Sequence, residues 1–375
     1  MFKDKNFIYQ KKTSILSEFD RVVFTSDFLK VDDRAADPLQ SPQDLNTLWL
    51  YKILSSAISS ILSKDSYPLL GQKYPDPLSR ISVYRQMYRE LSGKGWSSIY
   101  NVIDDEIVVS RIADRLSGSL VVSFEAPGYL VKLMNDHGIP FVDFTIHPIR
   151  FLQDYVFGMR TNISSVQERI PQLSINDDII EDYARISTAR TMRVYQNRPI
   201  KPGSGVFFGQ IGVDASLISG GVMAGIDEVA DAIIKMKAEH PNVYYKAHPH
   251  AESLDKLKKL VNDLEVNWLE ANAYDILASP EVQSVGSMSS GILHEAQYFG
   301  VNTKRYLAID PPYAPRGADH LQAARLGLYL PMNPAVLSKP ALSYLFGSGS
   351  TPPPLSELDP YLGALKYSLN MKWGR

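Results

Sequence analysis

The chain has no cysteine among its 375 residues, and this absence excludes disulfide bonds and thiolate zinc sites. It also lacks any run of about 18 apolar residues, the length that a membrane-spanning helix needs. Residues 1–6 do not form the continuous apolar core of a signal peptide. We therefore expect a soluble, cytoplasmic protein.

The chain also lacks a charge excess, since 39 Lys and Arg balance 41 Asp and Glu to a net charge of -2. This balance argues against nucleic acid as a partner, although a local basic site could still hold a phosphate. Hydrophobic residues are plentiful at 45%, enough for two cores joined by a hinge. The 21 tyrosines could line a sugar-binding cleft, although any single tyrosine is more often a core-edge or surface residue.

Short apolar strands alternate with helices along the chain, which predicts an α/β fold with parallel sheets covered on both faces. The connection 197–205 holds two prolines and two glycines, so we place the domain boundary there. The predicted domains are 1–200 and 201–350, with a C-terminal helix in 351–375 packing back on the first. The predicted strands are 21–26, 117–123, 139–145, 206–211, 243–247, 266–269, 282–285 and 303–309, and the predicted helices are 42–63, 77–93, 127–136, 176–196, 225–240, 252–264 and 291–299.

Three polar loops follow strands of the second half, where parallel strands present their carboxyl ends to a ligand. Residues 284–296 place serines between a strand and a helix, which is typical of a phosphate-binding turn. Lys246 and His248 follow another strand and could bind the same phosphate. Glu295 could reach a ribose hydroxyl or be a solvated helix residue. We reject a metal site at His248 and His250, because no nearby residue completes the ligand set.

Carboxylates occupy two further loops. Asp214 lies in the glycine-rich loop 209–216, where its spacing favours a turn or helix cap over a catalytic role. Glu125 follows a strand of the first half, and it could transfer a proton or complement a helix dipole. His147 and Arg150 are candidate substrate contacts at another strand exit. The acidic triplet 104–106 is assigned to helix capping and not to metal binding.

In order, these motifs resemble the retaining β-Kdo glycosyltransferases of bacterial capsule and lipopolysaccharide O-antigen synthesis. The resemblance rests on 209–216, on 246–249 and on 289–300. It covers about 205–307, whereas the first half shares only the general β/α pattern. The resemblance implies a GT-B-like architecture, with two doubly wound Rossmann-like domains facing across a cleft. The first domain would bind the acceptor and the second the CMP-sugar.

The resemblance also implies CMP-β-Kdo as the donor, with no cofactor or metal. Asp214 would be the nucleophile of a double displacement through a glycosyl-aspartate, and Glu125 the acid/base. Because Gly212 and Val213 precede Asp214 where the family often has acidic residues, a related 2-keto sugar acid stays open as the donor. The implied donor-binding residues are Gln210, Ser216, Lys246, His248, Ser287, Ser289, Ser290 and Glu295.

The acceptor implied by this resemblance is a saccharide on a lipid-linked glycan, reached by a peripheral contact with the inner membrane. Family members are often modules of larger polymerising enzymes, so this chain could be such a module. Two other functions stay open. One is a nonhydrolysing UDP-sugar epimerase with the same fold, and the other is a catalytically silent glycan-binding module.

Overall fold

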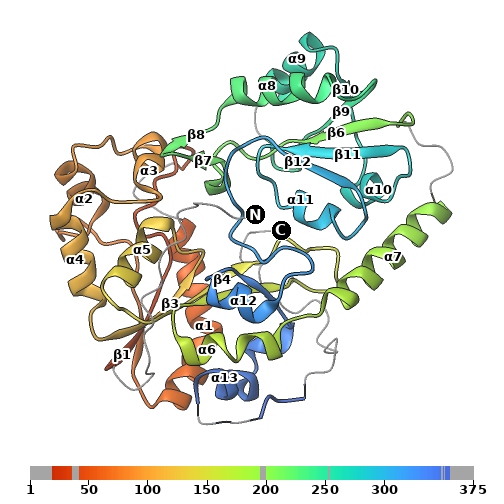
Figure 1. Ribbon diagram of the computed structural model, residues 1–375. Helices are drawn as coiled ribbons and strands as arrows, with labels where there is room; N and C mark the ends of the chain where they lie inside the picture. Colours follow the sequence, from red (N-terminus) through yellow and green to blue (C-terminus); the bar gives the residue numbers. More distant parts are fainter. Residues whose placement is uncertain are drawn as a thin grey trace.

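Two sheets organise the computed structural model, which describes residues 19–35, 42–194, 200–251, 254–347, 349 and 351–354 (Figure 1). The first sheet has the strand order β13-β5-β4-β3-β1-β2, and the second β10-β9-β6-β11-β12. Each has a Rossmann-like, doubly wound order, which confirms the predicted GT-B-like α/β fold. The predicted C-terminal helix lies outside the described residues.

The first sheet forms because its central strands are apolar on both faces. All six residues of β3 are buried, and so are all six of β4. The strands β1 to β4 run parallel, whereas β5 and β13 are antiparallel to their neighbours. The strands are β1 (Arg21–Thr25), β2 (Ser66–Pro68), β3 (Ser119–Phe124), β4 (Phe141–Ile146), β5 (Phe157–Thr161) and β13 (Leu330–Met332).

Helices cover both faces of this sheet (Figure 1). They are α1 (Pro42–Leu62), α2 (Arg80–Gln86), α3 (Gly93–Ile99), α4 (Glu106–Leu116), α5 (Gly128–Asp136), α6 (Ser164–Gln167) and the 3-10 turn η1 (Ile170–Leu173). The next helix, α7 (Asp177–Val194), packs against the second domain. The capping interpretation of 104–106 is confirmed, because the Asp105 carboxylate accepts a hydrogen bond from the Val108 amide at 2.9 Å. Helix α2 is shorter than predicted, since it ends at Met87 and Tyr88 then adopts a positive φ of 54°.

The second sheet is entirely parallel. Its strands are β6 (Ser204–Phe208), β9 (Val243–Lys246), β10 (Asn267–Trp268), β11 (Val282–Ser287) and β12 (Asn302–Arg305). Its helices are α8 (Ile226–Lys237), α9 (Leu254–Asp263), α10 (Ala273–Leu277) and α11 (Ile292–Ala296), and the loop after β6 holds the 3-10 turn η2 (Ala215–Leu217) and the hairpin β7 (Ile218–Ser219) and β8 (Val222–Met223). The strand order reverses at β6, so the loops after β6 and β11 meet at one edge.

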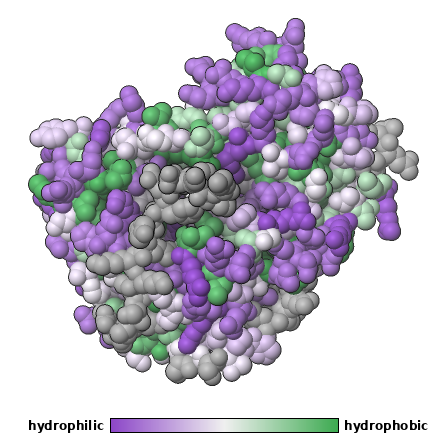
Figure 2. Space-filling model, in the orientation of Figure 1, coloured by the Kyte–Doolittle hydropathy of each residue, from purple (hydrophilic) through white to green (hydrophobic). Residues whose placement is uncertain are grey.

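The chain then returns to the first domain, where Figure 1 shows α12 and α13 in blue. The returning elements are α12 (His320–Arg325), β13, the 3-10 turn η3 (Pro334–Leu337) and α13 (Lys339–Phe346). This differs from the predicted extent of the second domain, 201–350. Strand β13 pairs with β5, and α13 packs on α1 with Leu342 and Phe346 buried in the first core. The surface in Figure 2 is largely hydrophilic, which fits cores that hold most of the apolar side chains.

Shortening one buried side chain tests whether α13 belongs to the first core. Leu342 is 0% exposed, so Leu342→Ala should lower the free energy of unfolding by about 2–5 kcal/mol, measured by urea denaturation. The matched control is Leu326→Ala, at a leucine that is 45% exposed, and it should change this free energy by no more than about 0.5 kcal/mol. Equal effects of the two variants would contradict the assignment.

Candidate functional site

Gln210 joins two loops at the edge of the second sheet where the strand order reverses. Its Oε1 accepts hydrogen bonds from the Ser289 amide at 2.8 Å and from the Ser287 hydroxyl at 3.1 Å. Its Nε2 donates to the hydroxyl oxygens of Ser216 and Ser289, both at 3.1 Å. The structure thus brings together four of the predicted donor-binding residues, here called the Gln210 cluster: Gln210, Ser216, Ser287 and Ser289.

A glycine fixes the path of the loop that carries Gln210. A Cβ on Gly209 would lie 2.3 Å from the Tyr245 hydroxyl, so only glycine allows the loop to pass over this ring. Tyr245 belongs to β9, the strand beside β6. The close approach therefore ties the Gln210 cluster to the neighbouring strand.

The other predicted donor-binding residues lie at the same edge and make local contacts. Lys246 ends β9, and its ammonium donates to the Ala247 carbonyl at 3.1 Å. The His248 Nδ1 accepts from the His250 amide at 3.1 Å. Ser290 accepts from the Ile292 amide at 3.4 Å, at the start of α11. These contacts position the loops, and binding of a nucleotide by these residues stays a prediction.

Helix α11 lies at the junction between the domains. It has five residues and is shorter than the predicted helix 291–299. A Cβ on Gly291 would be 3.0 Å from the Pro148 Cβ, so the amino end of α11 packs against a loop of the first domain. Its next turn carries Glu295, whose exposed fraction is 4%.

Glu295 is not the solvated helix residue that was one of its two interpretations. Its Oε1 accepts from the Arg150 amide at 2.7 Å and from the Tyr274 hydroxyl at 3.0 Å, which links α11 to the first domain. Burial raises the pKa of Glu295 to about 7, against the opposing effect of these hydrogen bonds and of the Arg150 charge. The carboxylate thus holds the junction, and its contact with a ribose stays a prediction.

His147 is fully buried in this structure, whereas Arg150 is exposed. The His147 ring lies 5.1 Å from that of His294 and 5.2 Å from that of Tyr313. Desolvation holds the pKa of His147 well below its ordinary value and lowers that of His294 to about 4. His294 lies within the serine-containing segment 284–296, and nothing in that local pattern indicates that its ring faces the other domain.

The loop after β6 also reaches the first domain. Ala215, Ile218 and Met223 pack into its core, and a Cβ on Gly221 would lie 3.6 Å from the Ser98 Cα in α3. This loop carries Asp214, whose side chain is exposed. The Asp214 Oδ1 caps η2 by accepting from the Ser216 amide at 2.9 Å, which confirms the cap interpretation.

Glu125 lies at the carboxyl end of β3 in a strained turn. Its φ is 53°, a conformation that costs a non-glycine residue about 1–3 kcal/mol and is enriched at functional sites. Its amide donates to the Phe144 carbonyl at 2.7 Å, and its Oε1 accepts from the Thr145 hydroxyl at 3.1 Å. The Glu125 side chain is exposed to solvent.

The charge of Asp214 acts on Glu125 across the domain junction. Desolvation raises the pKa of Glu125, and the Asp214 charge adds to this rise, while Thr145, Lys30 and Arg150 oppose it. Desolvation likewise raises the pKa of Tyr313 to about 12, with contributions from both carboxylates. Each carboxylate thus lies in a loop that follows a strand, Glu125 after β3 of the first sheet and Asp214 after β6 of the second, which is where such sheets bind ligands.

Three further residues of this site were missed by the sequence analysis: Lys30, Tyr100 and Tyr313. The Lys30 ammonium lies 4.6 Å from the centre of the Trp96 ring. Desolvation raises the pKa of Tyr100, and so do the charges of Asp27, Glu125 and Asp214. These residues lie in segments without a sequence motif, so only the tertiary structure groups them.

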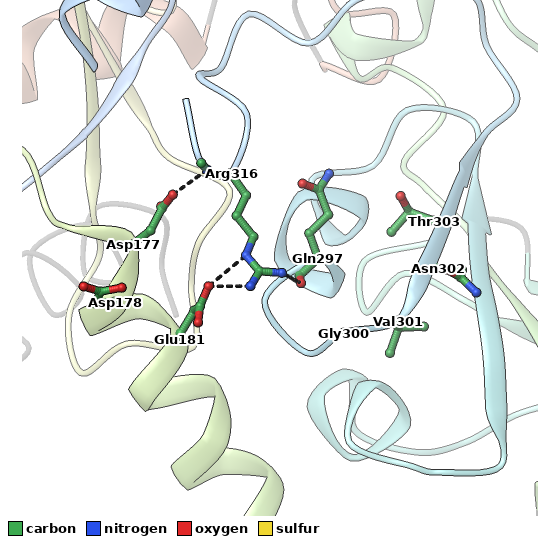
Figure 3. Close-up of a pocket in the computed structure, with 10 residues that line it drawn as sticks. Asp177, Asp178, Glu181, Gln297, Gly300, Val301, Asn302, Thr303 and Arg316 are labelled. Atoms are coloured by element: carbon green, nitrogen blue, oxygen red, sulfur yellow. Dashed lines mark hydrogen bonds and ion pairs between the residues drawn. The ribbon is translucent and has the colours of Figure 1, made fainter. Parts of the chain in front are cut away.

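A cavity of about 850 Å³ lies elsewhere, between α7 and the second domain (Figure 3). Its charged groups bind other protein groups. Arg316 forms an ion pair with Glu181 and donates to the Gln297 carbonyl at 2.8 Å, while Asp177 accepts from the Gly317 amide at 2.6 Å. We interpret this cavity as a gap in the packing between the two domains. None of its lining residues is among the candidate catalytic or donor-binding residues.

Among the residues that the structure describes, no group of three or more His, Cys, Asp or Glu side chains could hold a metal ion. None of the helices described combines the length and hydropathy needed to cross a membrane.

No protein-family model matches the chain, and no curated protein does. Among solved structures, the chain is similar to the β-Kdo 2,4 transferase of Thermosulfurimonas dismutans KpsC, with 12% identity over 85% of this chain and 98% of that one and a TM-score of 0.35. The β-Kdo 2,7 transferase of the same KpsC has 13% identity over 60% and 81% of the two chains, also with a TM-score of 0.35. The UDP-GlcNAc 2-epimerase of Methanocaldococcus jannaschii has 10% identity over 67% and 79%, with a TM-score of 0.27. These likenesses are too distant to support a function.

The raised pKa of Glu295 predicts a pH-dependent stability. Between its ordinary value of 4.5 and about 7, the folded state keeps a proton that the unfolded state has released, so this stabilisation is lost as pH rises through 7. The free energy of unfolding of the wild type, minus that of Glu295→Gln, should fall by roughly 3 kcal/mol across this window. Urea denaturation at several pH values measures it.

A matched control for this experiment is Glu168→Gln, at an exposed carboxylate paired with Arg325. Its stability curve should run parallel to that of the wild type. If Glu295→Gln were also parallel, the carboxylate would not hold its proton in the folded state.

Proposed function

We propose that the chain is a retaining glycosyltransferase that moves a Kdo residue from CMP-β-Kdo to a saccharide acceptor on a lipid-linked glycan. The observation that carries this proposal is the Gln210 cluster beside the exposed Asp214 carboxylate, with the exposed Glu125 carboxylate after a strand of the other domain. The sequence resemblance supports it independently, because its motifs supply Asp214, Gln210 and the serines of that cluster. The reaction belongs in bacterial surface polysaccharide assembly.

The second domain would bind the donor. Hydroxyl and amide groups of the Gln210 cluster, with Ser290 at the start of α11, offer hydrogen bonds to the CMP moiety. Lys246 and His248 extend this surface at the end of β9 and add a cation for the phosphate. No cofactor is needed, since CMP is itself a good leaving group.

Asp214 would be the nucleophile. The hydrogen bond from the Ser216 amide fixes the orientation of the carboxylate, and exposure leaves the side chain accessible to the donor. In the first displacement, a carboxylate oxygen bonds to the anomeric carbon, and the bond from that carbon to the CMP oxygen breaks. CMP leaves with the electron pair. Capping and catalysis by Asp214 are therefore compatible.

Glu125 would be the base of the second displacement. It accepts the proton of the acceptor hydroxyl while that oxygen bonds to the anomeric carbon, and the ester bond to Asp214 breaks. A carboxylate with a raised pKa is a stronger base, and desolvation supplies this rise here. Arg150, Tyr100 and Tyr313 lie around this position and could contact the sugars.

Intact-mass analysis after incubation with CMP-Kdo tests the nucleophile. The wild type should gain the mass of one Kdo residue, whereas Asp214→Asn keeps the cap but cannot form the ester and should gain none. Asp227→Asn is the control, since this exposed aspartate lies in the first turn of α8 and should leave the adduct unchanged. An adduct on Asp214→Asn would remove this residue from its role.

Glu125→Gln separates the two displacements. Loss of the base should lower turnover with acceptor by roughly 10²- to 10⁴-fold, while the adduct still forms and now accumulates. Burst kinetics of CMP release measure both steps. Turnover close to that of the wild type would contradict the assignment.

Incubation of the wild type with UDP-GlcNAc in the absence of acceptor addresses the other two functions. Epimerised UDP-sugar would identify an epimerase. A protein that binds glycan but turns over neither donor would be a binding module.

A further inference from the structure

The turn that carries Glu125 is held by two buried charged residues that the proposed mechanism does not use. Asp143, in β4, is 0% exposed, and Arg160, in β5, has a side-chain exposure of 12%. They form an ion pair with a separation of 2.8 Å. Removing charges from water is costly, and buried pairs of this kind are often no more stabilising than apolar residues of the same size. Stability alone therefore does not explain the pair.

Both members of the pair bind the residue that follows Glu125. The Asp143 Oδ1 accepts from the Ala126 amide at 3.1 Å, and Arg160 donates to the Ala126 carbonyl at 3.2 Å. The Glu125 amide is itself fixed by the Phe144 carbonyl at 2.7 Å. The peptide groups on both sides of Glu125 are thus held, which is how a strained backbone conformation persists.

Strand β4 also connects this support to the Glu125 carboxylate. Asp143 and Thr145 are two residues apart and therefore point to the same face of the sheet. Asp143 accepts a hydrogen bond from the backbone of the turn at Ala126, while the Thr145 hydroxyl donates to the Glu125 Oε1 at 3.1 Å. A Cβ on Gly158 in β5 would lie 2.6 Å from the Thr145 Cγ2, so a glycine makes room for this side chain.

The returning C-terminal segment completes the arrangement. The Tyr329 hydroxyl donates to the Asp143 Oδ2, and the Arg160 guanidinium lies 4.3 Å from the centre of the Tyr329 ring. The Tyr329 ring lies 5.6 Å from that of Tyr313, a residue of the proposed acceptor site. The Asp143 carboxylate therefore binds the Ala126 amide, Arg160 and Tyr329, and the Arg160 guanidinium binds Asp143 and the Ala126 carbonyl.

We propose that Asp143 and Arg160 are positioning residues that fix Glu125 in its strained turn for proton transfer with the acceptor. The proposal rests on the proposed function of Glu125. It assigns the acceptor half of the reaction to a network that runs from β3 through β4 and β5 to Tyr329. Asp143 and Arg160 act through Glu125 and do not contact the sugars.

Two variants test the proposal. Asp143→Asn keeps an oxygen for the Ala126 amide but removes the charge opposite Arg160. Arg160→Lys keeps a charge opposite Asp143 but cannot bind that carboxylate and the Ala126 carbonyl with a guanidinium fork. Each should lower kcat with acceptor roughly 10- to 100-fold, because misplacement of a catalytic group slows the step it serves. The KM for CMP-Kdo and the formation of the Asp214 adduct should change little.

The control is Asn162→Ala. Asn162 is buried and accepts from the Phe141 amide at 2.9 Å, at the opposite end of β4 from Glu125. It should lower the unfolding temperature without lowering kcat per folded molecule. If this control slowed the acceptor step as strongly, or if the two variants left kcat unchanged, the positioning role would be overturned.

A second readout needs no substrate. Carbon-13 NMR of labelled glutamate, assigned with Glu125→Gln, follows the titration of Glu125 directly. In Asp143→Asn the Glu125 side chain should become more solvated, so its titration should move towards that of an ordinary glutamate. Asn162→Ala should leave the titration of Glu125 unchanged. An unchanged titration would overturn the proposal. An inactive wild type would overturn the proposed function alone, since the NMR result would still decide on positioning.

Discussion

The packing of the loop after β6 onto the first domain decides where the candidate chemistry lies. Ala215, Ile218 and Met223 place apolar side chains in the first core, and Asp214 is carried with them. Without this contact, Asp214 would cap a turn on the second domain alone. With it, the exposed Asp214 carboxylate faces the first domain, and its charge adds to the rise that desolvation causes in the pKa of Glu125.

The junction between the domains is polar and specific, and this has consequences for both domains. Glu295 binds a backbone amide of the first domain, and the buried rings of His147 and His294 meet across the boundary. Such groups are costly to bury unless they are hydrogen-bonded, and Glu295 accepts two such bonds at the junction. The contacts of Glu295 connect the two domains near the loops that carry the candidate catalytic carboxylates.

Strain and support occur together in the first domain. Glu125 adopts a backbone conformation that few non-glycine residues adopt. It persists because the amides of Glu125 and Ala126 donate to Phe144 and Asp143, and Arg160 donates to the Ala126 carbonyl. The returning segment takes part through Tyr329. The segment that returns to the first domain therefore contacts both the core and the residues that support Glu125.

Local patterns in the sequence were sufficient for the α/β alternation, most strand positions, the Asp105 and Asp214 caps, and the loops that hold Gln210 and the serines. They were sufficient because caps, strands and loops depend on residues that are close in the chain. Strands β2, β5 and β13 of the first sheet and the hairpin strands β7 and β8 were missed, since most of them have only two or three residues and β13 pairs with a strand far away in the chain. The placement of Lys30, Tyr100, Tyr313 and His294, the burial of His147 and Glu295, and the support of Glu125 by Asp143 and Arg160 were decided only by the tertiary structure. These features depend on contacts between distant segments, whose distances and desolvation no local pattern contains.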